Sequence, residues 1–328
     1  MKKNILGVFC LFIFLTFCLT GMAMADYPTK PVVLVTYSSP GGGTDVFLRT
    51  LAKHMEPYIK GVSLVVENRP GGGGSTAMNY VATAKPDGYT LLGVTPNYLF
   101  TPLLGKTARS YRDLTAVVRA FVDPMLVYVK YDSPFNSLKD VIDAAKKNPG
   151  KQRWGSGAVG SSDQMVVYKI KTATNVNVAT APFEGGGDLL VAVLGGHVDL
   201  GVGEPGELMG QVDAKKVKIL AVVTEKRLTT LPNVPTAQES SGYNIVIPEK
   251  FRGLVGPKGV SAEAMTWWEG KIQQVLKDPK YKSYYESVNL IPAFLGSKEF
   301  SANIEKENQI ASEFLKEIGM FKEFKEKK

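Results

Sequence analysis

The sequence contains few of the residues that support covalent or metal-based chemistry. Only two of its 328 residues are cysteines, Cys10 and Cys18, and only two are histidines, His54 and His197. Both cysteines fall in an N-terminal segment that we expect to be removed, so the mature chain would have no disulfide, catalytic thiol or cysteine-ligated metal. The formal charge of +8 is spread along the chain without a long basic block. This distribution argues against a nucleic-acid partner and only weakly favours small anions.

The sequence also lacks a segment long enough to span a membrane. Its one long apolar run, residues 5–19, is about 15 residues, whereas a spanning helix needs roughly 20. The run follows two lysines and precedes Ala-Met-Ala at residues 23–25, a combination typical of a secretory signal peptide. Lipidation of Cys18 is a weaker alternative, because bulky Phe17 precedes it. We expect residues 1–25 to be cleaved, the mature chain to start at Asp26 with a charge of +6, and the protein to reside in the periplasm.

The remaining chain alternates short apolar segments with helical patterns, which predicts an α/β fold with a mostly parallel sheet. Ser137–Asp140 is a capping box, and Asn148–Gly150 ends the helix that it begins. From Ser261 onward, apolar stripes predict helices that cover a sheet. About 300 residues usually form two domains. The clearest strand candidates are continuous apolar runs, as expected for strands covered on both faces: residues 32–35, 64–66, 90–94, 125–129, 198–202 and 219–223.

Three glycine turns stand between a predicted strand and a predicted helix, at residues 40–45, 70–76 and 183–188. A helix start leaves backbone N–H groups unpaired and carries partial positive charge, so an anion fits there. Glycine permits positive φ and lets a ligand approach the backbone closely. Each turn could therefore hold a carboxylate or phosphate, or could be a tight structural turn. The binding role is favoured most for the first turn.

Residues 155–160 match the pattern G-x-G-x-x-G, which is a dinucleotide-binding signature only in the right context. The preceding residues 151–153 make a poor buried strand, and the next acidic residue at a useful distance, Glu184, lies too far downstream. A loop rich in N–H and hydroxyl donors is the better interpretation, with Ser156, Ser161 and Ser162 as donors.

Catalytic groups are sparse. His54 and His197 are far apart and are interpreted as surface or turn residues. A serine hydrolase using Ser156 or Ser161 is an alternative, but neither has an evident histidine–acid pair. A hard-metal site is conceivable near the glycine-rich turns, although helix capping is the favoured role of its three acidic candidates, Asp199, Glu204 and Glu207. We therefore expect no enzyme, no cofactor and no metal.

At this point a series of motifs resembles the tripartite tricarboxylate transporter substrate-binding proteins, also called the Bug family. The motifs run in the family's order across nearly the whole mature chain. One departure is at residues 36–40, where Thr-Tyr-Ser-Ser-Pro replaces the common Pro-Phe-Ala-Pro and leaves the ligand's identity open. The matching segments are Tyr27–Val35, Ser39–Asp45, Val65–Gly74, Lys85–Leu92, Gly155–Gly157, Phe183–Gly187, Leu194–Leu200, Arg227–Thr236 and Arg252–Val260.

The resemblance implies a two-lobed, type II-like periplasmic binding protein with a ligand cleft between α/β domains joined by crossing strands. The implied lobes are residues 26–120 with 245–328, and residues 121–244. Such a protein captures a small organic carboxylate by lobe closure and delivers it to a membrane permease of large and small integral subunits. The implied state is a monomer. A sensor that reports the ligand to a membrane signalling partner is an alternative with the same pocket.

The resemblance also implies which residues hold the ligand carboxylates. In the family these are loops from both lobes, acting through backbone N–H groups, hydroxyls and waters. The implied first-lobe residues are Ser38, Ser39, Gly42, Gly43, Thr44, Asp45, Thr95 and Asn97. The implied second-lobe residues are Ser156, Gly157, Ser161, Gly185, Gly186, Gly187 and Asp188.

Overall fold

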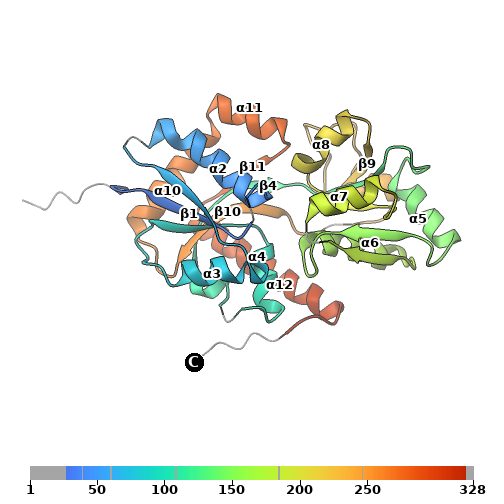
Figure 1. The fold of residues 1–328 in the computed structure, drawn as a ribbon, viewed down its shortest axis with the longest axis horizontal. Coiled ribbons are helices and arrows are strands. Elements are labelled where there is room, and N and C mark those ends of the chain that lie inside the picture. The colour runs from blue at the N-terminus through green and yellow to red at the C-terminus, as the bar shows by residue number, and fades with distance from the viewer. Residues whose placement is uncertain are drawn as a thin grey trace, which may run out of the picture.

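The computed structural model describes residues 27–322, apart from Ser39, Lys60, Ala108, Glu184 and Val246. The predicted signal peptide, residues 1–25, lies outside the described part. The chain forms two lobes side by side (Figure 1). The first lobe is built on a six-stranded sheet of order β11-β4-β10-β3-β1-β2. Its strands are β1 (Val32–Thr36), β2 (Leu64–Asn68), β3 (Thr90–Val94), β4 (Leu114–Asp123), β10 (Lys250–Pro257) and β11 (Ile291–Leu295).

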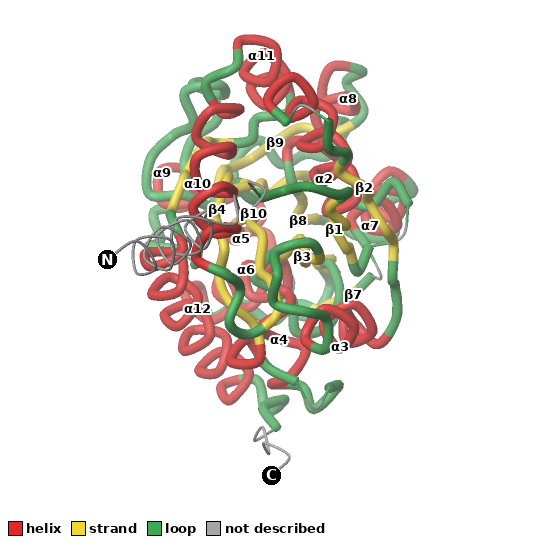
Figure 2. The backbone as a smooth tube through the Cα atoms, turned by 90° about the vertical axis from the view of Figure 1, so that its left-hand side faces the viewer, coloured by secondary structure: helices red, strands yellow, loops and turns green. Residues whose placement is uncertain are grey.

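Helices cover both faces of this sheet. On one face, α2 (Gly43–Met55), α10 (Ala262–Leu276) and α11 (Pro279–Ser287) share a core around Leu48 and Trp268. On the other, α3 (Ser75–Ala82), α4 (Asn97–Leu103) and the first half of α12 (Ser297–Glu317) pack around Phe251 and Phe300. Figure 2 shows the strands of the first lobe side by side, with α10 and α12 lying across them. Short 3-10 turns occur at Glu56–Tyr58, Gly72–Gly74 and Tyr111–Asp113.

The second lobe has a three-stranded sheet, β8-β5-β9, and a two-stranded sheet, β6-β7, joined by a parallel bridge between Trp154 and Leu200. Its strands are β5 (Leu126–Lys130), β6 (Arg153–Ser156), β7 (Ala179–Pro182), β8 (Gly201–Gly203) and β9 (Val217–Val222). Its helices are α5 (Leu138–Lys147), α6 (Ser162–Thr174), α7 (Gly186–Leu194), α8 (Pro205–Asp213) and α9 (Ala237–Ser241). The capping box at Ser137 starts α5 as predicted, with both reciprocal bonds present.

The prediction of a mostly parallel sheet is wrong. In the described part, only the pairs β1–β2, β1–β3 and β6–β7 are parallel, while β10–β3, β10–β4, β11–β4, β5–β8 and β5–β9 are antiparallel. For β4 and β10 the reason lies in the connection of the lobes. β4 carries the chain toward the second lobe and β10 carries it back, so the two strands must run in opposite directions. Asp123 at the end of β4 pairs in register with Lys250 at the start of β10, at the junction of the lobes.

The lobes also share one apolar core. Phe100 of α4 packs edge to face on Phe314 of α12, with ring centroids 6.2 Å apart, and Tyr168 of α6 packs on the same ring at 5.4 Å. Phe314 and Leu315 belong to the cluster that contains the second-lobe residue Trp154. The end of α12 therefore packs against the second lobe, although α12 begins on the first.

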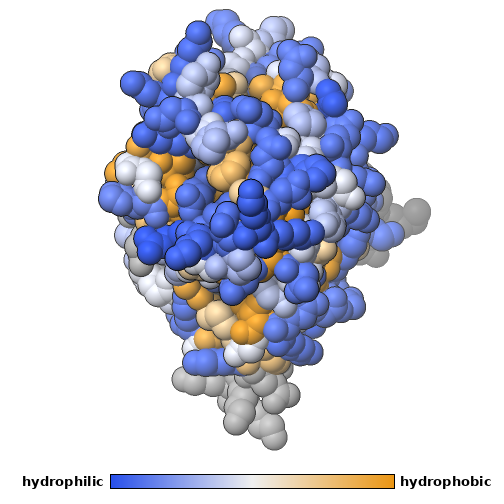
Figure 3. All heavy atoms as spheres, turned by 90° about the vertical axis from the view of Figure 1, so that its right-hand side faces the viewer, coloured by the Kyte–Doolittle hydropathy of each residue, from blue (hydrophilic) through white to orange (hydrophobic). Residues whose placement is uncertain are grey.

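The outer face of the second lobe is mostly hydrophilic, with scattered apolar patches (Figure 3). Across the residues that the structure describes, no helix has both the length and the apolar character needed to cross a membrane.

Candidate functional site

The start of α2 has no side-chain cap. Its N-cap residue, Gly42, is extended, and the Gly42 carbonyl accepts from the N–H of Val46 at 3.0 Å. The N–H groups of Gly43 and Thr44 have no acceptor among the described residues. Because a helix start carries partial positive charge, these free N–H groups can hold an anion.

Asp45 shapes this turn from within. Its buried carboxylate accepts hydrogen bonds from Gly41 N at 2.9 Å, Arg49 Nε at 2.9 Å and Asn68 Nδ2 at 2.8 Å. Burial alone would raise the pKa of Asp45, but the bonds from Arg49, Gly41 and Asn68 outweigh it and lower the pKa. Asn68 also donates to the carbonyl of Ser38 at 3.0 Å. The Asp45 carboxylate thus holds the loop in place, and its charge is already satisfied.

A buried arginine lies directly behind the start of α2. A Cβ added to Gly43 would lie 3.2 Å from Arg252 Nη2 and 3.3 Å from Nη1. Arg252 pairs with Asp123, with Nε 2.8 Å from Oδ2, and only 10% and 3% of the two side chains are exposed. The absence of a side chain at Gly43 therefore places a guanidinium next to free helix N–H groups, which adds positive charge to the anion site.

Further charged groups gather where the crossing strands meet the second lobe. Lys250 Nζ lies 3.3 Å from Asp163 Oδ1 and forms an ion pair with Glu204. Asp163 is in the first turn of α6, and Glu204 is the N-cap residue of α8. Lys250 thereby links the crossing strand β10 to two helix starts of the second lobe.

The start of α6 is already occupied by the protein's own groups. Ser161 is its N-cap, and the Ser161 hydroxyl accepts from Gln164 N at 3.2 Å. The N–H of Ser162 donates to Asn97 Oδ1 of the first lobe at 3.5 Å. Asn97 therefore makes a contact between the lobes, and Ser161 serves as a cap.

Residues 151 and 152 lie in no strand, in line with the prediction for residues 151–153. The short strand β6 begins at exposed Arg153, continues through fully buried Trp154 and overlaps the start of the G-x-G-x-x-G motif. Ser156 is also buried, and its hydroxyl donates to the carbonyl of Gly157 at 3.2 Å. A Cβ on Gly157 would lie 2.3 Å from Asp163 Oδ2. Because a carboxylate lies against the glycine, the loop is unsuited to a phosphate and the dinucleotide interpretation remains disfavoured.

The start of α7 faces a carboxylate of the same lobe. Gly185 is its N-cap without a side-chain bond, and Gly186, Gly187 and Asp188 form its first turn. A Cβ on Gly186 would lie 2.0 Å from Glu207 Oε2, whereas one on Gly187 would meet nothing within 4 Å. Glu207 therefore occupies the space beside Gly186 that a larger residue would fill.

The surroundings of Glu207 shift the pKa of its carboxyl group strongly, although the residue is exposed to solvent. Desolvation, with smaller contributions from the charges of Asp163 and Asp123, raises its pKa to about 7 against the opposing effect of Arg252. Tyr128 of β5 also faces this group, since Glu207 contributes to the raised pKa of the Tyr128 hydroxyl after burial. Glu207, on α8 of the second lobe, is therefore exposed to solvent yet close enough to Asp123 and Arg252 of the crossing strands for their charges to affect its pKa.

Thr95 and the second glycine turn make contacts within the first lobe. The hydroxyl of buried Thr95 lies 2.7 Å from the Tyr37 hydroxyl. The second glycine turn packs on Tyr37, since a Cβ on Gly74 would lie 3.5 Å from its ring. Thr101 donates to the Gly73 carbonyl at 2.6 Å, which gives this turn a structural role. Ser39 lies outside the described residues.

The structure thus brings the predicted Gly43, Gly157 and Gly186 to one region, arranged around charged side chains. Sequence reasoning singled out Glu204 and Glu207 among these but missed Asp123, Asp163, Lys250 and Arg252. A signal was present, because Lys250 and Arg252 interrupt an otherwise apolar strand. The charged side chains at this junction, called the junction cluster below, are Asp123, Asp163, Glu204, Glu207, Lys250 and Arg252.

The remaining acidic and histidine candidates from the sequence, Asp199 and His54, lie outside the junction cluster. Asp199 accepts from the N–H of Arg153 at 2.7 Å, so it supports β6. No group of three or more metal-binding side chains forms within the described ranges. His54 stacks on Tyr281 of α11, with ring centroids 4.7 Å apart.

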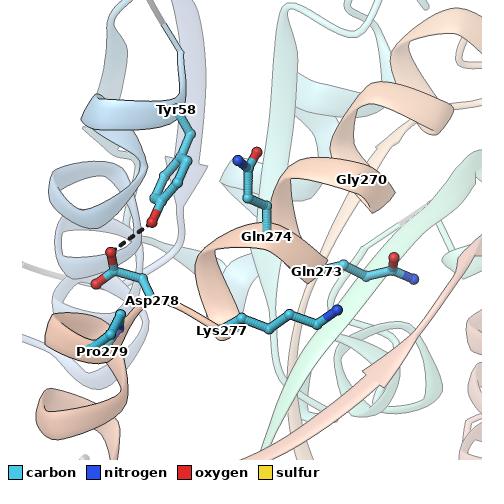
Figure 4. Close-up of a pocket in the computed structure, with 7 residues that line it drawn as sticks. All are labelled: Tyr58, Gly270, Gln273, Gln274, Lys277, Asp278 and Pro279. Atoms are coloured by element: carbon cyan, nitrogen blue, oxygen red, sulfur yellow. Dashed lines mark hydrogen bonds between the residues drawn. The ribbon is translucent and has the colours of Figure 1, made fainter.

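A surface hollow of about 470 Å³ lies in the first lobe where α10 and α11 meet (Figure 4). Its wall includes the hydrogen bond from the Tyr58 hydroxyl to Asp278 Oδ2 at 2.6 Å. None of the predicted ligand residues and no member of the junction cluster lines it. The lining residues are Tyr58, Gly270, Gln273, Gln274, Lys277, Asp278 and Pro279.

Comparison with known proteins gives consistent matches over most of the chain. A family model described as the tripartite tricarboxylate transporter family receptor matches residues 47–320. A UPF0065 protein of the gbd 5' region from Cupriavidus necator is 29% identical over 283 residues, covering 86% of this chain and 85% of its own. Protein BugT from Bordetella pertussis is 26% identical over 278 residues, covering 84% and 85%.

Solved structures extend these matches to the fold. The periplasmic binding protein BugD has 28% identity and a TM-score of 0.79, covering 90% of this chain and 100% of that chain. An R. palustris protein solved with adipate has 27% identity and a TM-score of 0.81, covering 90% and 99%.

Proposed function

Because this chain belongs to the tripartite tricarboxylate transporter family of receptors, a family of two-lobed α/β solute-binding proteins, we propose that it is a periplasmic receptor for a small organic carboxylate. The ligand is bound between lobes formed by residues 26–120 with 245–328 and by residues 121–244. It is then delivered to the integral subunits of a membrane permease. The protein acts as a monomer and as a binding protein, without catalysis.

The observation that carries this proposal is the free start of α2 with Arg252 behind it. The N–H groups of Gly43 and Thr44 have no acceptor among the described residues, and the guanidinium lies 3.2 Å from where a Gly43 side chain would begin. Hydrogen bonds to charged groups are worth roughly 1.5–3 kcal/mol each, so a few of them suffice for useful affinity after ordering costs. The adipate bound to the R. palustris relative supports a carboxylate as the class of ligand.

The geometry gives less support to a serine hydrolase. The Ser156 hydroxyl is bonded to a backbone carbonyl, and the Ser161 hydroxyl caps α6. His54 packs against Tyr281, on α11 of the first lobe. In the described part of the chain, no histidine bonds to either serine.

The test is a thermal-shift measurement on the chain from Asp26 onward against adipate, succinate, glutarate, citrate and their amino derivatives. A ligand at about 100 times its Kd adds about 2.7 kcal/mol to stability, which raises Tm by several degrees. We expect at least one compound to do so, and Gly43→Val to abolish the shift by obstructing the N–H groups and pressing on Arg252. The matched control is Gly270→Val at an exposed position of α10, where a Cβ meets nothing within 4 Å.

An unchanged shift in Gly43→Val would exclude the start of α2 as the binding site. If the whole panel fails with the parent protein while neutral sugars respond, the carboxylate assignment is wrong. Delivery is tested separately, by measuring uptake of the responding carboxylate in a strain that lacks the gene. Unchanged uptake would favour a sensory role.

A further inference from the structure

The junction cluster contains one carboxylate without a protein partner. Asp123 is paired with Arg252, while Asp163 and Glu204 are both paired with Lys250. Glu207 is exposed, and its carboxylate has no hydrogen bond or ion pair with any residue that the structure describes. It is nevertheless held in a defined place, against Gly186 at the start of α7 and near Gly203 of β8.

The cluster as a whole is short of positive charge. It contains four carboxyl groups but only two cations. The consequence appears at Glu207, where desolvation, Asp163 and Asp123 raise the pKa to about 7 against the opposing effect of Arg252. The fourth titratable group that faces it, Tyr128, is neutral because burial raises its pKa above the usual value. A positive group placed beside Glu207 would therefore be stabilised.

The first lobe instead presents positive charge to the ligand. There the free N–H groups of Gly43 and Thr44 lie beside the Arg252 guanidinium, and no carboxylate of α2 competes for them because Asp45 is turned into the loop. A ligand between the lobes thus meets a positive pole at α2 and a negative pole at Glu207. A simple dicarboxylate can place one carboxylate at the start of α2, but its second carboxylate then lies near the unpaired Glu207, and the two like charges repel each other.

Building on the carboxylate-binding function proposed above, we propose that the ligand carries a protonated amine as well as a carboxylate. The carboxylate binds at the start of α2 beside Arg252, and the ammonium pairs with Glu207. Glu207 is thereby the residue that selects amino acids, most simply amino dicarboxylates, over the corresponding dicarboxylates.

The test uses matched pairs that differ only in the amino group: 2-aminoadipate with adipate, glutamate with glutarate, and aspartate with succinate. Binding is measured by titration calorimetry at pH 7.5. We expect the amino member of at least one pair to bind tenfold or more tightly than its partner. Glu207→Gln should lose that preference, with tenfold or more weaker binding of the amino compound and unchanged or tighter binding of the dicarboxylate. The matched control is Glu299→Gln, which removes an exposed first-turn glutamate of α12.

The pH dependence gives an independent test. An ammonium beside Glu207 lowers its pKa in the complex, so binding releases a proton and affinity should rise between pH 6 and pH 8. Affinity that falls over this range would instead mean that protonated Glu207 donates to a second ligand carboxylate, which overturns the inference. Equal binding within every pair, or a preference unaffected by Glu207→Gln, also overturns it but leaves the receptor function intact. Only a failure of both series to bind counts against the receptor function itself.

Discussion

The ion pair between Arg252 and Asp123 joins the two crossing strands, and its removal should be costly. Both side chains are at most 10% exposed, so Arg252→Met leaves an uncompensated carboxylate in the protein interior. Breaking a buried pair from one side costs about 3–5 kcal/mol. For a chain of this size we expect Tm to fall by at least about 6 °C, and urea unfolding to show the same loss of free energy.

The double variant Asp123→Leu/Arg252→Met separates stability from ligand binding. Replacing a buried pair by apolar residues of similar volume is often neutral or stabilising by about 1–4 kcal/mol, so most of the lost stability should return. Carboxylate binding should not return, because the guanidinium behind α2 is still absent. The control is Arg112→Met, which breaks a pair whose side chains are 55% and 61% exposed and should cost less than about 1 kcal/mol.

Two results would refute this reasoning. A loss below about 1 kcal/mol in Arg252→Met would mean that Asp123 is solvated after the change. A double variant as unstable as the single one would mean that the arginine contributes through packing and not through charge.

Two further predictions concern the first lobe. Glu307 of α12 is 6% exposed, and burial raises its pKa from 4.5 to about 7. Between these pH values the folded state keeps a proton that the unfolded state releases. The free energy of unfolding should therefore fall by up to about 3 kcal/mol as the pH rises from 4.5 to 7. Glu307→Gln should flatten that slope in urea titrations, and an unchanged slope would assign it to other groups. Gly253→Ala should cost at least about 1–3 kcal/mol, because its Cβ would lie 2.7 Å from the Val118 carbonyl oxygen and from Phe300. Gly270→Ala, in open space on α10, should instead stabilise by about 0.5–1 kcal/mol, and equal effects of the two changes would contradict the steric argument.

Sequence patterns correctly predicted the helices and strands that are encoded by residues close together in the chain. The run at residues 90–94 is β3 itself, and the capping box at Ser137 begins α5. These elements are encoded by neighbouring residues, through continuous apolar side chains or through a cap three positions away. The sequence pattern was therefore sufficient to place them.

Local patterns did not locate the crossing strands that the family resemblance implied, for the opposite reason. β4 contains Arg119 and Asp123, and β10 contains Lys250 and Arg252, so neither is a continuous apolar run. These charges are tolerated in buried strands because each has a partner elsewhere, as Arg252 has in Asp123, 129 positions away. No local periodicity contains that information, and the same long-range pairing makes the sheet mixed.

Three helix starts show the limit of the glycine argument most clearly. Those of α2 and α7 follow two of the glycine turns recognised in the sequence, and that of α6 follows the glycine-rich motif at residues 155–160. A helix start offers an anion site at each of them. In the structure α6 is capped by Ser161 and by Asn97 from 65 positions away, and α7 faces the carboxylate of Glu207. Only α2 combines free N–H groups with a cation behind them. Whether a helix start binds a ligand is thus decided by what the rest of the chain places there, which is why we place the negative charge of the proposed ligand at α2 and its positive charge at Glu207.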